Sequence, residues 1–347
     1  MYKFKKVIAL LKKGRFDTAL SILCTRLGIN SRIHHPPYLI DIEPTNACNL
    51  QCPTCITGSG NMNRPKRMMR LEEFKRIIDQ VKSYAIDIQL YGYGEPFLNK
   101  ELPKMIRYAV DCGLYVGTGT NGESFKDDEF CREVVNSGLH HVVICLDGAD
   151  QETLSKYRVN SNFDDIVAGI QRMRQIRDSL KAKTPILEVQ FITMKHNQHQ
   201  SKLISDYAKK LGADVFCEKT VGINITAQNF NELAEKFLPD DLSKSRYEKD
   251  EDGNIQLKGE ISNYCPRVYQ SLVINSDGTV VPCCYDEHSD FIMGNVFESD
   301  LADIWRNEKY QAFRDQIKKD RHSIINCRKC SVGRYKIGTK NRLKEID

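Results

Sequence analysis

Cysteine is the residue type in this chain best suited to chemistry, because 13 of the 347 residues are cysteines. Cys48, Cys52 and Cys55 form a C-x3-C-x2-C cluster, and a second group follows at Cys265, Cys283, Cys284, Cys327 and Cys330. Thiolates crowded in one loop repel one another, and a bound metal centre relieves that repulsion. Such spacing, in a chain without a secretory signal, indicates metal binding or catalysis rather than disulfides.

The spacing of the first three cysteines fits two kinds of metal site. A structural zinc ion takes four protein ligands, and no obvious fourth ligand lies in the loop with Cys48, Cys52 and Cys55. Three cysteines can instead hold three irons of a 4Fe–4S cluster, which leaves the fourth iron open to a small molecule. The second group suits either a four-cysteine zinc site or an iron–sulfur cluster. Two zinc sites would make the chain a non-enzymatic interaction module.

Composition excludes several other classes. The chain has 51 basic and 46 acidic residues, with no clustered basic strip, so we expect no nucleic-acid partner. No apolar run approaches the ~18 residues that span a bilayer. Lys12, Lys13 and Arg15 interrupt the apolar N-terminal stretch, and no small-residue cleavage site follows. These features predict a cytoplasmic protein.

The middle of the chain alternates between two kinds of segment. Longer helical stretches, such as Leu71–Tyr84 and Phe163–Leu180, separate six short β-like runs: Tyr38–Ile42, Asp87–Tyr93, Leu114–Thr118, His141–Leu146, Ile186–Thr193 and Asp214–Cys217. Strand followed by helix, six times over, predicts a parallel sheet with crossover helices. Periodicity alone does not decide between an open sheet and a full or partial barrel.

Three regions follow from this pattern. Residues 1–37 read as a helical preface, 38–220 as the α/β core and 221–347 as a smaller α+β domain. In the last region, Ser276-Asp277-Gly278 predicts a hairpin turn between Ser271–Ile274 and Val280–Val281, and a helix is expected over Leu301–Ile317. The basic, amphipathic preface is expected to pack on the core, and weak contact with a membrane surface is the alternative.

Four motifs occur in order, each after a predicted strand. They are the cluster loop from Glu43 to Cys55, Tyr91-Gly92-Tyr93-Gly94-Glu95-Pro96, Thr120-Asn121-Gly122 and Leu146-Asp147-Gly148. Together they resemble the signatures of the radical S-adenosylmethionine family. The resemblance implies a partial (β/α)6 TIM-type barrel over residues 38–220. It also implies a three-cysteine 4Fe–4S cluster that cleaves S-adenosylmethionine to a 5′-deoxyadenosyl radical.

The same resemblance implies which residues contact the cofactor. They are Tyr93, Gly94, Glu95, Asn121, Asp147, Arg158 and Asn197. This chain departs from the family pattern twice: Thr54 stands where an aromatic residue usually precedes the third cysteine, and Tyr93 stands at the first glycine of the Gly-Gly-Glu motif. The resemblance further implies a flavodoxin- or ferredoxin-type reductant as partner.

The C-terminal cysteines resemble the SPASM extension of this family. Because no cysteine follows Cys330, the stretch looks like the shortened, single-cluster twitch form. The resemblance implies one auxiliary 4Fe–4S cluster, held by Cys265, Cys283, Cys327 and Cys330. Cys284 would then be either a spare cysteine or an alternate ligand, and it is also a catalytic candidate. Cys217, at the end of the sixth strand, is a candidate hydrogen-atom donor.

These features predict an enzyme that removes a hydrogen atom from a small-molecule or peptide substrate. If the auxiliary cluster accepts an electron from the substrate radical, the net reaction is a two-electron oxidation, for example of a sugar or aminocyclitol alcohol. If a thiol returns a hydrogen atom, the enzyme is an epimerase. Modification of a ribosomal peptide is a third reading.

Overall fold

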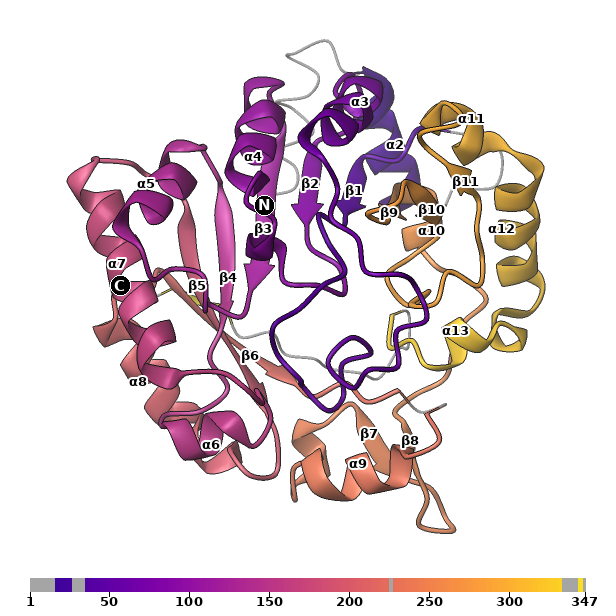
Figure 1. Cartoon of the computed structure of the whole chain (residues 1–347). Helices are drawn as coiled ribbons and strands as arrows, with labels where there is room; N and C mark the ends of the chain where they lie inside the picture. The colour runs from indigo at the N-terminus through magenta and orange to yellow at the C-terminus, as the bar shows by residue number, and fades with distance from the viewer. Residues whose placement is uncertain (1–15, 27–34, 225–226, 333–342, 346–347) are drawn as a thin grey trace.

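The computed structural model describes residues 16–26, 35–224, 227–332 and 343–345. Six consecutive strands pair side by side in parallel (Figure 1). They are β1 (Leu39–Ile42), β2 (Asp87–Leu90), β3 (Tyr115–Thr120), β4 (His141–Cys145), β5 (Ile186–Thr193) and β6 (Val215–Thr220). The expectation of a mixed α/β fold with a TIM-like parallel sheet is therefore confirmed.

The alternation along β5 shows why these residues form a barrel wall. Leu187, Val189 and Phe191 are fully buried, and we assign them to the outer, helix-covered face. The intervening Glu188 and Gln190 line the interior. Successive side chains on a strand point to opposite faces, so one strand supplies both an apolar outer face and a polar inner one.

Helices cover the outer face of this sheet (Figure 1). In α3 (Leu71–Val81), the residues Phe74, Ile77, Ile78 and Val81 are buried at helical spacing. The other crossover helices are α4 (Leu102–Asp111), α5 (Asp128–Asn136), α6 (Gln151–Ser155), α7 (Phe163–Ser179) and α8 (Ser201–Lys210). Their buried faces and the outer strand faces make one continuous core.

The C-terminal region continues the same sheet. Strand β9 (Ser271–Ile274) pairs in parallel with β1, and β10 (Thr279–Val281) returns antiparallel to β9, which confirms the predicted hairpin. Strands β11 (Gly294–Asn295) and β12 (Leu343–Glu345) extend the two edges, so that ten strands form one sheet. A domain boundary near residue 221 stays a prediction, because strands from both sides of it share this sheet.

The prediction of one helix over Leu301–Ile317 is wrong. The structure has two helices, α11 (Leu301–Arg306) and α12 (Glu308–Asp320), separated at Asn307. Asn307 adopts an extended conformation that ends α11, and its side-chain oxygen accepts a hydrogen bond from the Tyr310 amide to cap α12. The remaining elements of this half are α9 (Phe230–Phe237), β7 (Tyr247–Lys249), β8 (Ile255–Leu257), α10 (Arg267–Gln270) and α13 (Ile325–Arg328).

Part of the helical preface is described as α2 (Phe16–Arg26). Ala19 and Ile22 pack with Tyr38, and the Thr18 hydroxyl donates a hydrogen bond to the Tyr84 carbonyl oxygen, so this helix rests on the core. Residues 1–15 and 27–34 of the preface lie outside the described residues, and membrane contact stays a prediction. Within the described ranges, no helix is both long enough and apolar enough to cross a bilayer.

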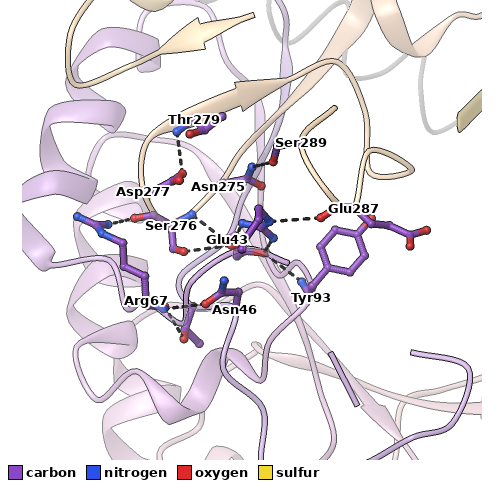
Figure 2. Close-up of polar contacts among 12 residues, drawn as sticks. Glu43, Asn46, Arg67, Tyr93, Asn275, Ser276, Asp277, Thr279, Glu287 and Ser289 are labelled. Carbon is purple, nitrogen blue, oxygen red and sulfur yellow. Dashed lines mark hydrogen bonds and ion pairs between the residues drawn. The ribbon is translucent and has the colours of Figure 1, made fainter. Parts of the chain in front are cut away.

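The carboxylate of Glu43 joins the barrel to the C-terminal hairpin (Figure 2). Glu43 is fully buried and receives two hydrogen bonds from the Arg64 guanidinium, at 2.9 and 2.8 Å. The Ser276 hydroxyl and amide also donate to it, at 3.1 and 3.3 Å, and the Tyr93 amide donates at 3.3 Å. One carboxylate therefore binds the cluster loop, the loop after β2 and the hairpin turn.

Replacing Glu43 should separate these parts. In Glu43→Ala the Arg64 guanidinium stays buried without its carboxylate, which costs about 3–5 kcal/mol. We expect the denaturant midpoint of the anaerobically purified protein to fall accordingly. The control is Glu72→Ala, which removes a solvent-exposed ion pair with Lys75 and should leave the midpoint nearly unchanged. Equal midpoints for the two variants would contradict this role of Glu43.

Candidate active site

A cavity of about 620 Å³ lies inside the barrel and opens among the loops that follow the parallel strands. We call it the central cavity. Its volume is typical of sites for small molecules. Cys48, Cys52 and Cys55 line it at one end. Because the carboxyl ends of parallel strands meet at one edge, the four sequence motifs all come to this region.

The backbone of the cluster loop is held in place by hydrogen bonds. The Cys55 amide donates to the Cys52 carbonyl oxygen at 3.1 Å, the Leu50 amide donates to the Cys48 sulfur at 3.4 Å, and the Gln51 amide donates to the Val159 carbonyl oxygen at 3.1 Å. Burial raises the pKa of the Cys52 thiol to about 11 and also raises the pKa of Cys48. A metal centre, which deprotonates coordinating thiols, would offset this cost.

The arrangement of the thiols distinguishes between metal centres. A single zinc ion needs its sulfur ligands at about 2.3 Å from one point. Among the described residues, no group of three or more His, Cys, Asp or Glu side chains is arranged to hold one metal ion. The three cysteines instead border a shared space, the central cavity. This donor set fits a multi-iron cluster with one open iron better than it fits zinc.

Gly94 lets the loop after β2 approach the cluster loop. A Cβ atom at this position would lie 2.2 Å from the Thr45 carbonyl oxygen and 2.6 Å from that of Ala47. The next amide, that of Glu95, donates to the Ala47 carbonyl oxygen at 2.8 Å. Only glycine permits this backbone contact. Gly94 and Tyr93 both line the central cavity, and their contact with a cofactor stays a prediction.

Glu95 is buried at the edge of the central cavity. Burial raises the pKa of its carboxyl group, against hydrogen bonds from the Asn121 amide at 2.8 Å and the Thr120 hydroxyl at 2.7 Å. Asn121 also lines the cavity, and its side-chain amide donates to the Asn49 side-chain oxygen at 2.8 Å. These contacts fix a carboxylate beside the cluster loop, where it can accept hydrogen bonds from an ammonium group.

Of the remaining predicted cofactor residues, one lines the central cavity and two do not. Arg158 lines the central cavity, and its Nε donates to Asp147 at 2.7 Å. Burial opposes its charge, yet Cys145 and Asp147 raise the pKa of the guanidinium well above its ordinary value. Asp147 and Asn197 are fully buried and do not line the cavity. The Asn197 amide donates to the Asp147 and Ile192 carbonyl oxygens, so this residue positions backbone instead.

Tyr157 is a cavity residue that sequence reasoning missed. Its hydroxyl lies 2.8 Å from that of Thr54, and its ring is buried beside the cluster loop. The structure thus places an aromatic ring from another segment next to Thr54, where the family pattern has an aromatic residue in the loop itself. No local sequence signal identifies Tyr157, because the contact spans 103 residues.

The barrel interior carries a polar wall that the sequence analysis also missed. Gln89, His141, Glu188, Gln190 and Lys219 line the central cavity from four strands. His141 Nε2 and a Glu188 carboxylate oxygen are 3.0 Å apart. A usable signal was present, since these polar residues occupy alternate positions in otherwise apolar strands.

Cys217 lies in this polar wall as well. Burial, together with the Glu188 charge, raises the pKa of its thiol to about 11, so the sulfur keeps its hydrogen at neutral pH. Gly119 in β3 also lines the cavity. It leaves open space there, because a Cβ atom at this position would lie 4.0 Å from its nearest neighbour, the Val143 carbonyl oxygen. The structure therefore brings the candidate hydrogen-atom donor Cys217 into the cavity that contains the cluster loop.

Cys265, Cys283, Cys327 and Cys330, which we call the auxiliary cysteines, gather at a second place in the fold. They come from the start of α10, the end of β10 and the α13 region. Burial raises the pKa of Cys327 to about 11 and that of Cys283 well above its ordinary value, and the Cys265 and Cys330 thiols add to both shifts. The four thiols therefore act on one another electrostatically within one region of the fold.

Cys284 follows Cys283, and burial raises the pKa of its thiol to about 11, with Arg267 lowering it and Asp41 and Cys330 raising it. Its sulfur accepts a hydrogen bond from Arg267 Nη1 at 3.3 Å, and its carbonyl oxygen accepts one from the Tyr93 hydroxyl. Tyr93 lines the central cavity, whereas Cys284 does not. The structure therefore places Cys284 between the two cysteine sites and not at the cavity wall.

Comparisons with known proteins agree with both sites. A family described as the radical SAM superfamily matches residues 42–187, and SPASM, described as an iron–sulfur cluster-binding domain, matches residues 265–331. An AdoMet-dependent heme synthase from Methanosarcina barkeri (strain Fusaro / DSM 804) is 26% identical over 313 residues, which cover 80% of this chain and 85% of that protein.

Solved structures show the same fold. BtrN in complex with AdoMet and 2-DOIA is similar with a TM-score of 0.51 and 17% identity, over 85% of this chain and 93% of BtrN. SuiB of Streptococcus suis bound to the precursor peptide SuiA has a TM-score of 0.59 and 17% identity, over 80% of this chain and 66% of SuiB. With the motifs, the barrel and both cysteine sites in place, the chain belongs to the radical S-adenosylmethionine superfamily, carries a SPASM-type domain, and uses 4Fe–4S clusters and S-adenosylmethionine as cofactors.

Proposed function

We propose that this enzyme removes a hydrogen atom from a small polar alcohol and oxidises it by two electrons to a ketone. The observation that carries the proposal is the single central cavity, which extends from the cluster loop to the polar barrel wall. Cofactor and substrate would share this space, with Cys48, Cys52 and Cys55 at one end and Glu188 and Lys219 at the other. Sugars and aminocyclitols have the hydroxyl and ammonium groups that such a wall can bind.

We assign the cofactor site to the loops at the strand ends. Cys48, Cys52 and Cys55 would hold the catalytic cluster, and Glu95 would accept hydrogen bonds from the amino group of S-adenosylmethionine. When bound, the reduced cluster and S-adenosylmethionine together supply a 5′-deoxyadenosyl radical. Arg158 presents a fixed cation to the same space, and the Tyr157 ring offers a face for a base to pack against.

The barrel wall selects the substrate in this proposal. Gln89 and Gln190 both donate and accept hydrogen bonds, Lys219 donates, and Glu188 accepts. Side chains of these kinds suit a ring that carries several hydroxyl groups and an amine. The open space at Gly119 leaves room for such a ring beside β3.

The electron released during oxidation needs an acceptor, and the auxiliary cysteines supply the site. Four thiolates would ligate all irons of one cluster, so this cluster transfers electrons and does not bind substrate. The catalytic cluster would be recharged by a flavodoxin- or ferredoxin-type protein. The 2-DOIA in the BtrN structure and the SuiA peptide in the SuiB structure belong to those proteins, so oxidation of a small molecule rests on the polar cavity of this chain.

Epimerisation is the second candidate, and one observation favours it. The Cys217 thiol lies in the cavity wall with its hydrogen retained, so it could return a hydrogen atom to a substrate radical. Oxidation yields a product two hydrogens lighter than the substrate, whereas epimerisation conserves mass and incorporates hydrogen from solvent. The two reactions therefore differ in a directly measurable way.

The first test concerns the catalytic cluster. The anaerobically purified protein should contain about eight irons, from two four-iron clusters. Cys48→Ala, Cys52→Ala and Cys55→Ala together should remove about half of this iron and abolish release of 5′-deoxyadenosine from S-adenosylmethionine. The matched control is Cys112→Ala, since Cys112 lies after α4, away from both sites, and should retain full iron and cleavage. Cleavage that survives in the triple variant would refute the assignment.

The second test concerns the substrate class. Deuterium from the carbinol carbon of labelled sugars or aminocyclitols should appear in 5′-deoxyadenosine. In Lys219→Met, loss of a charged hydrogen bond worth about 1.5–3 kcal/mol should raise KM for that substrate more than tenfold. Cleavage of S-adenosylmethionine without substrate should be unchanged, as it should be in the surface control Lys209→Met. An unchanged KM would argue against the polar wall as the substrate site.

The third test separates oxidation from epimerisation. In deuterium oxide, the proposed oxidation should give a ketone two mass units lighter than the substrate, without carbon-bound deuterium. Cys217→Ala should then retain turnover, because the thiol is not consumed in that reaction. If the product instead keeps the substrate mass plus one solvent deuterium, and Cys217→Ala abolishes it, the enzyme is an epimerase and oxidation is wrong.

A further inference from the structure

Arg321, which is buried, and Arg267, which is partly buried, contact cysteines of the C-terminal region. Arg321 is 1% exposed, and its Nη2 lies 3.7 Å from the Cys330 sulfur. The same guanidinium donates to the Tyr264 carbonyl oxygen at 3.0 Å and to that of Val332 at 2.8 Å. These backbone contacts aim the planar group at the auxiliary cysteines and hold it there.

Arg321 also has an unused donor. Its Nε is buried and has no hydrogen-bond partner among the described residues. The Cys265, Cys330 and Cys327 thiols all influence this guanidinium. A buried donor without an acceptor costs about 1–3 kcal/mol, so its retention beside three thiols points to an acceptor that binds among them. A cluster with inorganic sulfide provides such an acceptor.

The Tyr310 hydroxyl gives a second observation of the same kind. Its hydroxyl is likewise buried without a partner in the described part of the chain, and the Cys283 and Cys265 thiols act on it. Coordinated thiolate sulfurs accept hydrogen bonds in a zinc site as well, so these donors indicate a bound anionic centre without choosing between the two metals. The sulfides of an iron–sulfur cluster accept hydrogen bonds, and such bonds are one of the factors that set its reduction potential.

Arg267 approaches from the side of the barrel. Its Nη1 lies 3.3 Å from the Cys284 sulfur, and its charge acts on Cys283 and on Tyr91, which lines the central cavity. In the described ranges neither arginine makes a direct ion pair with a carboxylate, although Cys284, Asp41 and Cys283 all raise the pKa of Arg267. Arg321 is a buried cation whose anionic neighbours are thiols, and a cluster bound among those thiols would add negative charge beside it.

We propose that Arg321 and Arg267 raise the reduction potential of the auxiliary cluster and so make it an electron acceptor for the substrate radical. This inference rests on the proposed function, which places a cluster at the auxiliary cysteines. Reduction adds one negative charge, and a fixed cation or a donated hydrogen bond favours the more negative state. Arg321 acts at Cys330 and Cys327, and Arg267 acts at the Cys283-Cys284 pair.

A higher potential of the auxiliary cluster favours one-electron oxidation of the substrate radical. The substrate radical, with its unpaired electron on the carbinol carbon, loses one electron to the oxidised auxiliary cluster, which is reduced by one electron. The hydroxyl proton leaves to a base, and the C–O single bond becomes a double bond. No other oxidant is needed, because the hydrogen atom was already taken by the 5′-deoxyadenosyl radical.

The test is an anaerobic redox titration of both clusters, followed by electron paramagnetic resonance. In Arg321→Met, the equilibrium constant for one-electron reduction of the auxiliary cluster should fall at least about tenfold, which corresponds to a potential about 59 mV lower. Arg321→Lys keeps the charge but loses Nε, so its potential should lie between those of the wild type and Arg321→Met. Arg267→Met should also lower the potential. The catalytic cluster in the same sample should not shift.

A matched control separates charge at the cluster from loss of any buried arginine. Arg177 is 5% exposed and its Nη2 donates to Asp214 at 2.9 Å, with no hydrogen bond to a cysteine sulfur among those described. Arg177→Met should leave the auxiliary potential in place. Iron content must stay at about eight per chain for each comparison.

The outcomes distinguish this inference from the proposed function. Unchanged auxiliary potentials in Arg321→Lys and Arg267→Met, with full iron, would overturn the inference and leave the oxidation intact. A wild-type protein without a second cluster would instead overturn the proposed electron acceptor, and this inference with it. If Arg321→Met loses its auxiliary iron, the conservative Arg321→Lys and the distant Arg267→Met still decide the question.

Discussion

The buried carboxylate of Glu43 is the interaction on which the arrangement of both cysteine sites depends. It accepts hydrogen bonds from the Arg64 guanidinium, from Ser276 in the C-terminal hairpin and from the Tyr93 amide (Figure 2). Gly92 allows this, since a Cβ there would lie 2.8 Å from Glu43 atoms. A buried ion pair adds little to stability by comparison with apolar packing, but it permits few alternative geometries. Here it fixes the orientation of three loops from distant parts of the chain.

These three loops connect the central cavity to the region of the auxiliary cysteines. Tyr93 belongs to the cavity wall, and its hydroxyl contacts the Cys284 carbonyl oxygen. The cavity and the auxiliary cysteines are thus joined through a few residues, even though their cysteines are more than 200 positions apart in sequence, as Cys55 and Cys283 show. The parallel pairing of β9 with β1 also joins the two regions in one sheet.

The barrel interior shows how the same strands serve stability and chemistry. Outward residues such as Val189 and Phe191 pack in the core, while inward residues such as Glu188 and Gln190 line the cavity. Buried polar groups are costly unless they are paired, and His141 pairs with Glu188 at 3.0 Å. The cavity therefore has a polar wall that is partly held by contacts within the protein.

The sequence alone predicted six strands alternating with helices and two groups of cysteines, because these depend on local periodicity and on motif spacing, while the partial barrel came from the family resemblance. A cofactor role for Gly94 and Glu95 stays a prediction, and the structure places both beside the cluster loop. Tertiary structure decided what local patterns do not encode. Asn307 divides an apparently continuous helix, because its side chain caps the following one. The aromatic ring beside Thr54 comes from Tyr157, and the donors around the auxiliary cysteines include Arg321, whose role follows only from burial and from contacts between distant segments.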